Sequence, residues 1–145
     1  MPVTNEQVAP LRAQLARQPE EHQRLFSLLD QSAIRSGYRA LVSAAFVTAA
    51  QRRFARDVSP SEVIDFVGDV RSRSAGVADQ VDPKTAERVI MAVFTGQSLD
   101  DIDPRTSWQT QLVLMAAIIG DEQLDDAGLD AFLAEARKLA DQWLT

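Results

Sequence analysis

The chain has 145 residues, of which 46% are hydrophobic and 25% are charged, and it has no cysteine. This length suits one domain spanning residues 1–145, and the composition is that of a globular protein rather than a disordered or fibrous one. The lack of cysteine excludes disulfides, thiolate metal sites and a cysteine nucleophile.

The charge is unevenly distributed along the chain. Its net value of −6 disfavours nonspecific binding to nucleic acid or to anionic membranes, which are held chiefly by cationic side chains. Residues 1–73 carry ten basic and eight acidic groups, whereas residues 74–145 carry five basic and thirteen acidic groups. The sequence therefore predicts a molecule that is electrically polar from one half to the other.

No segment resembles a signal peptide or a membrane span. The first 21 residues contain no apolar run, and the longest uncharged stretches, 40–50 and 106–120, are shorter than the roughly 18 to 20 residues that a spanning helix needs. We expect a cytoplasmic protein without membrane contact. Thirteen of its fifteen basic residues are arginine, which is compatible with a GC-rich bacterial source.

Apolar residues recur at steps of three and four along most of the chain, which predicts an all-α bundle of six or seven helices. Thr4 and Gln7 form a candidate capping box for the first helix, whose start we place between residues 4 and 10. Pro19, followed by two glutamates, indicates the start of the second helix.

Two helices are apolar on nearly all sides and are predicted to lie at the centre of the bundle. The first covers about residues 38–55, after Gly37, which marks either a break or a tolerated interruption. The second covers about residues 104–119 and is expected to end at Gly120.

Between these two helices, Ser59-Pro60-Ser61-Glu62 has the residues of a strong helix start. The helix that it opens should bury four apolar side chains that lie on one face over two turns. These are Val63, Phe66, Val67 and Val70. The small and polar residues that follow predict a flexible loop over residues 72–81.

The segments QVDPKT (80–85) and DIDPRT (101–106) share a pattern because each suits a helix start, and not because they are copies of one functional module. In each, the aspartate can cap a helix and the proline suits its first position, where no backbone donor is needed. The residues that follow diverge, so we interpret Asp82 and Asp103 as caps rather than as members of a repeat. Gly96 is the predicted left-handed stop of the helix that follows Asp82.

The last helix begins within residues 121–130, and its apolar face should lie in the core. That face comprises Leu129, Phe132, Leu133, Ala136, Ala140 and Trp143. Trp108 and Trp143 are both interpreted as core anchors.

Signatures of catalysis are sparse. The chain has one histidine, His22, and no glycine-rich phosphate loop, so we expect no cofactor and no enzymatic activity. One alternative is a hydrolase of a small phosphorylated substrate that depends on Mg²⁺ or Mn²⁺. Its carboxylate ligands would be Asp121, Glu122, Asp125 and Asp126.

The favoured hypothesis is a protein–protein interaction or regulatory module, with homodimerisation as one form of it. The candidate contact residues are Arg52, Arg53, Arg56, Asp100 and Asp101. The arginines among them also permit a second alternative, a nucleic-acid-binding regulator. The excess of acid in the second half disfavours that alternative.

Overall fold

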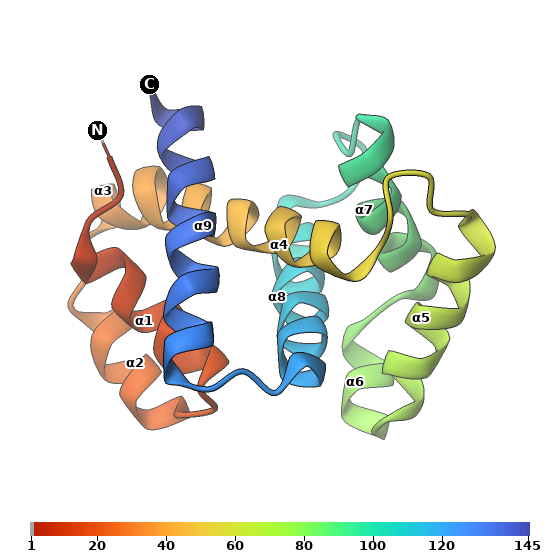
Figure 1. Ribbon diagram of the computed structural model, residues 1–145, viewed down its shortest axis with the longest axis horizontal. Coiled ribbons are helices and arrows are strands. Elements are labelled where there is room, and N and C mark those ends of the chain that lie inside the picture. Colours follow the sequence, from red (N-terminus) through yellow and green to blue (C-terminus); the bar gives the residue numbers. More distant parts are fainter. Residues whose placement is uncertain (1) are drawn as a thin grey trace. The chain divides into compact units, whose positions relative to one another are not determined.

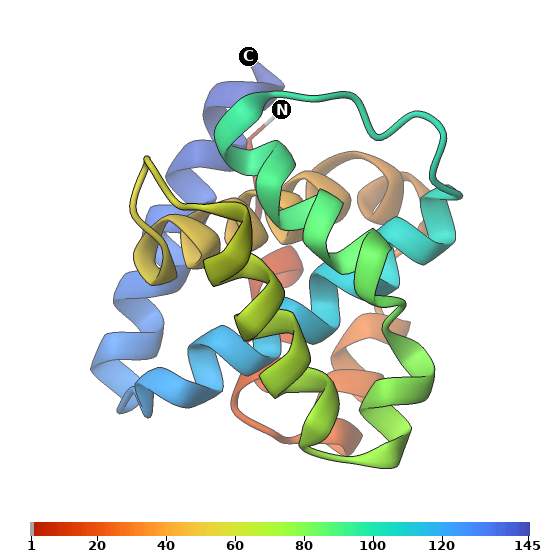
Figure 2. The same cartoon turned by 90° about the vertical axis from the view of Figure 1, so that its right-hand side faces the viewer.

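A computed structural model describes residues 2–145 (Figures 1 and 2). Of the chain, 78% is helical, and this part contains no strand, which confirms the all-α prediction. The described residues form eight separate helices, one or two more than the sequence predicts.

The chain divides into two compact units. Unit 1 combines residues 2–48 with residues 119–145, and unit 2 is the continuous stretch 49–118. The two apolar helices predicted near 38–55 and 104–119 are present as α4 (Arg39–Arg53) and α8 (Pro104–Glu122). Each of them begins in one unit and ends in the other.

In unit 1, α1 (Asn5–Leu15) packs on α2 (Pro19–Ser27) and on α9 (Asp126–Leu144), as Figure 1 shows. The Thr4 side chain accepts from the backbone of Gln7, and the Gln7 side chain accepts from the backbone of Thr4, so the predicted capping box is confirmed. Pro19 begins α2 as expected.

The chain of unit 1 then continues as an unbroken helix through α3 (Gln31–Ala33), the π-helical turn η1 (Ile34–Tyr38) and α4. A π-helical turn frees backbone groups from the regular hydrogen-bond ladder. The amide of the buried Gln7 donates to the carbonyl oxygen of Ala33 at 3.0 Å. A Cβ atom on Gly37 would lie only 2.4 Å from that amide, so the glycine permits the close approach of Gln7.

In unit 2, α5 (Pro60–Ser72) lies beside α6 (Ala75–Gln80) and α7 (Pro83–Thr95), as Figure 2 shows. Ser59 caps α5, with its side chain accepting from the backbone of Glu62 at 3.3 Å. The four apolar side chains predicted for the core of this helix are all buried.

The helix α6 lies inside residues 72–81, where the sequence predicted a loop. Ser74 caps it by accepting from the backbone N–H of Val77 at 3.1 Å. With six residues, α6 is too short for an apolar period to be recognised, so its composition was interpreted as that of a loop. Arg71 holds this segment in place by donating to the carbonyl oxygens of Val81 and Ala78 at 2.8 and 3.4 Å.

The two Asp-Pro segments are helix caps, as predicted. Asp82 Oδ2 accepts from the backbone N–H and the hydroxyl of Thr85 at 2.9 and 3.1 Å. Asp103 Oδ2 accepts from the same two groups of Thr106 at 3.4 and 3.3 Å. The shared threonine is therefore part of the cap, a contribution that the sequence pattern alone did not reveal.

Of two predictions about helix ends, one is confirmed and the other is wrong. Gly96 closes α7 in the left-handed conformation, with φ of 71°, as expected. The prediction for Gly120 was wrong, because α8 continues through it to Glu122 and the chain turns at Gln123, with φ of 50°. Gly120 instead lies where the guanidinium of Arg17 passes close to the helix.

Candidate functional site

All five residues predicted to contact a partner belong to unit 2. Arg52 and Arg53 end α4, and Arg56 lies in the turn that follows it. Asp100 and Asp101 lie in the loop between α7 and α8. The three arginines are exposed, so the C-terminal end of α4 presents them to solvent. Positive side chains at this end of a helix also interact favourably with its dipole.

Arg53 is placed by a cluster of aromatic rings. Its guanidinium carbon lies 5.0 Å from the ring centroid of Phe54 and 5.1 Å from that of Phe66. The two rings meet edge to face at 5.3 Å, and Phe54 meets Phe94 in the same way at 6.4 Å. A guanidinium over aromatic faces gains cation–π energy and loses rotamer freedom. Arg53 is therefore a pre-positioned cation at the surface of unit 2.

Within residues 2–145, neither Arg53 nor Arg56 forms an ion pair with a carboxylate, whereas Arg52 interacts with another group of the chain. The stretch from Arg53 to Arg56 is thus the part of the predicted arginine set that keeps its hydrogen-bond donors available to solvent. The sequence marked these residues by charge alone and missed the aromatic rings beneath Arg53.

Asp101 has an intramolecular partner. Its two carboxylate oxygens accept from Nη1 and Nη2 of Arg88, both at 2.8 Å, and Nη2 also donates to the carbonyl oxygen of Ser98 at 3.4 Å. The hydrogen bond from Arg88 lowers the pKa of Asp101. This pair fastens the loop after Gly96 to α7, so one of the five predicted contact residues has a structural role within unit 2.

Asp100, the other acid, is exposed, and its backbone N–H donates to Ser98 Oγ at 3.1 Å. Arg88 was missed as a partner of the loop. The left-handed residue predicted at Gly96 could have indicated this contact, because it turns the acidic loop back along α7, the helix that carries Arg88.

The four acids proposed as metal ligands each make other interactions within the chain. Asp125 caps α9 by accepting from the backbone of Gly128 at 2.7 Å, and Asp126 forms an ion pair with Arg12 at 3.5 Å. Asp121 and Glu122 also interact with other groups of the chain. Within residues 2–145, no three or more His, Asp or Glu side chains lie together in a geometry that could hold a metal ion. The structure therefore does not bring these four acids together as a ligand set.

His22 has a structural position in unit 1. Its Nδ1 lies 2.7 Å from the carbonyl oxygen of Pro10, which can only accept, so Nδ1 carries the hydrogen. Its ring also stacks on Phe26 with the centroids 5.9 Å apart. These two contacts join α2 to α1.

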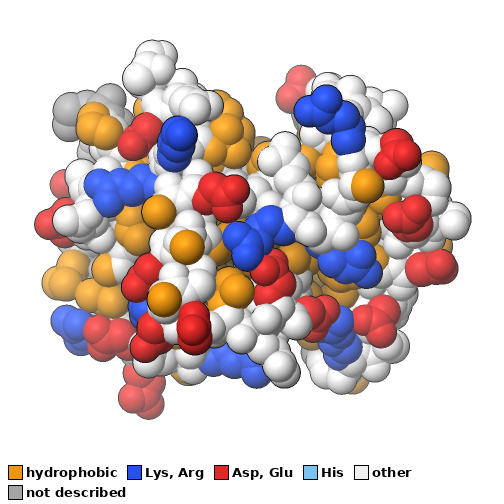
Figure 3. Space-filling view, in the orientation of Figure 1, with side chains coloured by type: hydrophobic (Ala, Val, Ile, Leu, Met, Phe, Trp, Pro, Cys, Tyr) orange, Lys and Arg blue, Asp and Glu red, His pale blue; other side chains and the backbone are white. Residues whose placement is uncertain are grey.

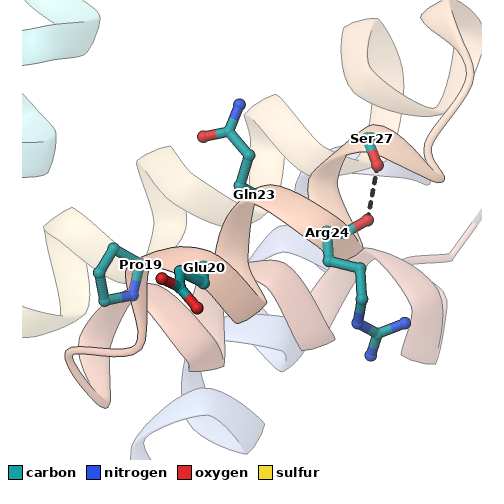
Figure 4. A pocket seen from close by; sticks show the side chains of 5 residues that line it. All are labelled: Pro19, Glu20, Gln23, Arg24 and Ser27. Atoms are coloured by element: carbon teal, nitrogen blue, oxygen red, sulfur yellow. Dashed lines mark hydrogen bonds between the residues drawn. The ribbon is translucent and has the colours of Figure 1, made fainter.

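One surface depression runs along α2 (Figure 4). It is wide open to solvent, has a volume of about 540 Å³, and is lined by exposed residues of this one helix. The lining residues are Pro19, Glu20, Gln23, Arg24 and Ser27. Arg24 is held by Glu21 at 2.5 Å, and the hydrogen bond lowers the pKa of Glu21. The depression is a shallow groove without converging polar groups.

Charge is distributed differently in the fold than along the sequence. Unit 1 contains seven basic and eleven acidic residues, a net charge of −4, and unit 2 contains eight basic and ten acidic residues, a net charge of −2. Unit 1 combines the two ends of the chain, so the basic first half and the acidic second half are mixed within it. On the face that Figure 3 shows, basic and acidic side chains are interspersed.

Trp143 differs from its prediction as a core anchor. The other five residues predicted for its face of α9 are buried, but Trp143 is 49% exposed. It lies in the last turn of α9, beyond the last buried residue of that face, Ala140. Trp108 is half-buried.

A search of residues 2–145 finds no helix whose length and apolar character would let it cross a membrane. Comparison with protein-family models, with curated proteins and with solved structures finds no match to this chain.

Proposed function

We propose that the protein is a non-enzymatic interaction module that binds an acidic segment of a partner protein at the end of α4. The observation that supports this proposal best is the position of Arg53, whose guanidinium rests on the rings of Phe54 and Phe66. Arginine is common in interface hot spots, where a pre-positioned side chain loses little entropy on binding.

The chemistry of the surface favours a carboxylate partner. The planar guanidinium can donate two parallel hydrogen bonds to a carboxylate while its face stays on the rings. Arg56 adds a second cation three residues away, which would speed the encounter with an acidic chain. A nucleic acid carries far more negative charge than a short acidic segment, so the net charge of −2 on unit 2 and of −6 on the whole protein disfavours it more strongly as the partner of this surface.

The test measures fluorescence anisotropy of a short labelled peptide rich in glutamate, titrated with the full-length protein at low salt. The wild type should bind it, and Arg53→Ala should weaken binding by about tenfold or more. Arg53→Lys should weaken it nearly as much, because lysine keeps the charge but lacks the planar fork. The double variant Arg35→Ala/Arg39→Ala is the matched control, since it removes two exposed arginines from unit 1 instead.

Three outcomes would contradict the proposal. The wild type could fail to bind the peptide, it could bind equally well after Arg53→Ala, or it could prefer a DNA duplex over the peptide at the same salt concentration. The last outcome would favour the nucleic-acid alternative. Light scattering then separates a foreign partner from a second copy of this chain, because only self-association raises the mass of the purified protein.

A further inference from the structure

A cavity of about 340 Å³ that is open to solvent on one side lies at the surface of unit 1, where α1 and α8 end and α9 begins. Its volume is within the range of small-ligand pockets, which begin at roughly 300 Å³. Arg17, Gln123 and Asp126 contribute polar side chains to its lining, and aliphatic residues contribute the remaining walls.

Two unusual backbone positions line this cavity. Among residues 2–145, Arg17 and Gln123 are the two non-glycine residues with positive φ, at 60° and 50°. Each follows the end of a helix, at the position where glycine is normally found because a Cβ atom is disfavoured there. Both helices thus end on a residue that costs stability, and both residues line the same cavity. Such outliers cluster at binding sites, where the side chain is needed more than an unstrained backbone.

Both side chains are exposed at the mouth of the cavity, where their hydrogen-bond donors remain available to a ligand. Within the described part of the chain, Arg17 and Gln123 make no side-chain hydrogen bond or ion pair. A Cβ atom on Gly120 would lie 3.0 Å from Nη2 of Arg17. The guanidinium therefore lies directly against α8 at a position that has no side chain. The glycine at position 120, which does not end the helix, leaves room for the guanidinium.

The rest of the lining limits what could bind. Leu15, Ile119, Leu124 and Leu129 provide apolar walls. Asp126 is 96% exposed and faces Arg12 at 3.5 Å, so part of its charge is offset. Arg17 therefore carries the cavity's unpaired formal charge.

We infer that this cavity binds a small organic carboxylate with a short aliphatic chain. The carboxylate would accept from the guanidinium of Arg17 and from the side-chain amide of Gln123. The chain would lie against the leucine and isoleucine side chains, where its burial is favourable. This site is independent of the proposed partner surface, since Arg17 belongs to unit 1 and Arg53 to unit 2.

Thermal unfolding of the full-length protein with acetate, butanoate or hexanoate, at constant ionic strength, tests the inference. Butanoate and hexanoate should raise the Tm by about 2 °C or more at saturation, and acetate should raise it less. Inorganic phosphate and butylammonium should have no comparable effect. No rise with any carboxylate, or an equal rise with phosphate, would overturn the assignment.

Arg17→Gly is the decisive variant because glycine adopts positive φ without strain. The variant should fold with an unchanged or higher Tm, yet lose the rise caused by hexanoate. Gln123→Gly should keep the fold in the same way and reduce the rise. If Arg17→Gly keeps the full rise, the carboxylate binds elsewhere and the inference is wrong.

Asp126→Asn tests the charge of the ligand. It removes a negative charge from the lining, so it should strengthen the effect of hexanoate and leave butylammonium without effect. The opposite result would identify a cationic ligand. Backbone NMR shifts on adding hexanoate should concentrate at residues 15–17 and 119–129, and shifts confined to the end of α4 would contradict the cavity as the site.

Discussion

In unit 1, the polar contacts between helices and chain ends join residues that are far apart in the sequence. Arg12 Nε donates to Asp130 at 2.6 Å across 118 positions, and the backbone of Val3 donates to Asp141 at 2.7 Å across 138 positions. In unit 2, the corresponding contacts are local: Arg71 reaches Val81 over 10 positions, and Arg88 reaches Asp101 over 13. Unit 1 is therefore closed by the two ends of the chain, whereas unit 2 is built from one continuous stretch.

This difference indicates where each unit should be most sensitive to mutation. Unit 2 has short loops to close and depends on its apolar residues, among which the ring of Phe54 contacts those of Phe66 and Phe94. Unit 1 has to hold together segments that start far apart, so its polar contacts between segments carry more of the specificity. The predictions below test this division, beginning with the largest expected effect.

Phe66→Ala should destabilise the protein by about 4 kcal/mol, because it leaves a cavity in the core of unit 2 and removes one of the rings beneath Arg53. Urea unfolding followed by circular dichroism measures the change. Ile64→Ala on the same helix is the control, since Ile64 is 48% exposed and its truncation should cost far less. Equal losses from the two variants would show that the aromatic cluster does not dominate unit 2.

Gly37→Ala should cost about 3 kcal/mol, because the new methyl group would occupy the position of the Gln7 amide and break its hydrogen bond to the carbonyl oxygen of Ala33. Gly68→Ala is the matched control in unit 2. Nothing lies within 4 Å of its Cβ position, so alanine should raise helix stability by about 0.5–1 kcal/mol.

A double-mutant cycle makes this test specific to the contact. If the clash with Gln7 is the cause, Gly37→Ala combined with Gln7→Ala should destabilise the protein by less than the sum of the two single variants. Additive losses would place the effect of Gly37 elsewhere.

Arg137→Ala should cost about 1.5 kcal/mol by releasing the N-terminal segment from α9. The guanidinium donates to Asn5 Oδ1 at 2.7 Å and to the carbonyl oxygen of Val3 at 2.5 Å. Hydrogen exchange should show the amide of Val3 losing protection, while the amides of α5 stay protected. Lys138→Ala, at the neighbouring exposed position, should change neither measurement.

The sequence predicts local structure in this protein better than long-range contacts. The caps at Thr4, Ser59, Asp82 and Asp103 each depend on residues at most three positions apart, so the pattern contains all the needed information. The buried faces of α5 and α9 follow from their helical periods, apart from Trp143 at the end of α9.

Features that depend on distant residues were not predictable in this way. The clash that requires glycine at position 37 involves Gln7, and the rings beneath Arg53 include Phe66 from another helix. The left-handed backbone at Arg17 and Gln123 was also missed, because glycine is the residue that signals this conformation. The arginines of the candidate site were identified from charge, but their availability depends on which acids fold next to them.

The smallest predicted effect concerns pH and compares Asp82 with its uncharged analogue. Hydrogen bonds from the backbone and hydroxyl of Thr85 lower the pKa of Asp82 in the folded state. A carboxylate with a lowered folded pKa stabilises the protein above the unfolded pKa of about 3.9, and this contribution is lost as the pH falls through the folded value. Asp82→Asn keeps the cap but does not titrate. Between pH 6 and pH 3 the wild type should therefore lose more stability to urea than Asp82→Asn does, and equal losses would mean that the cap acts through geometry alone.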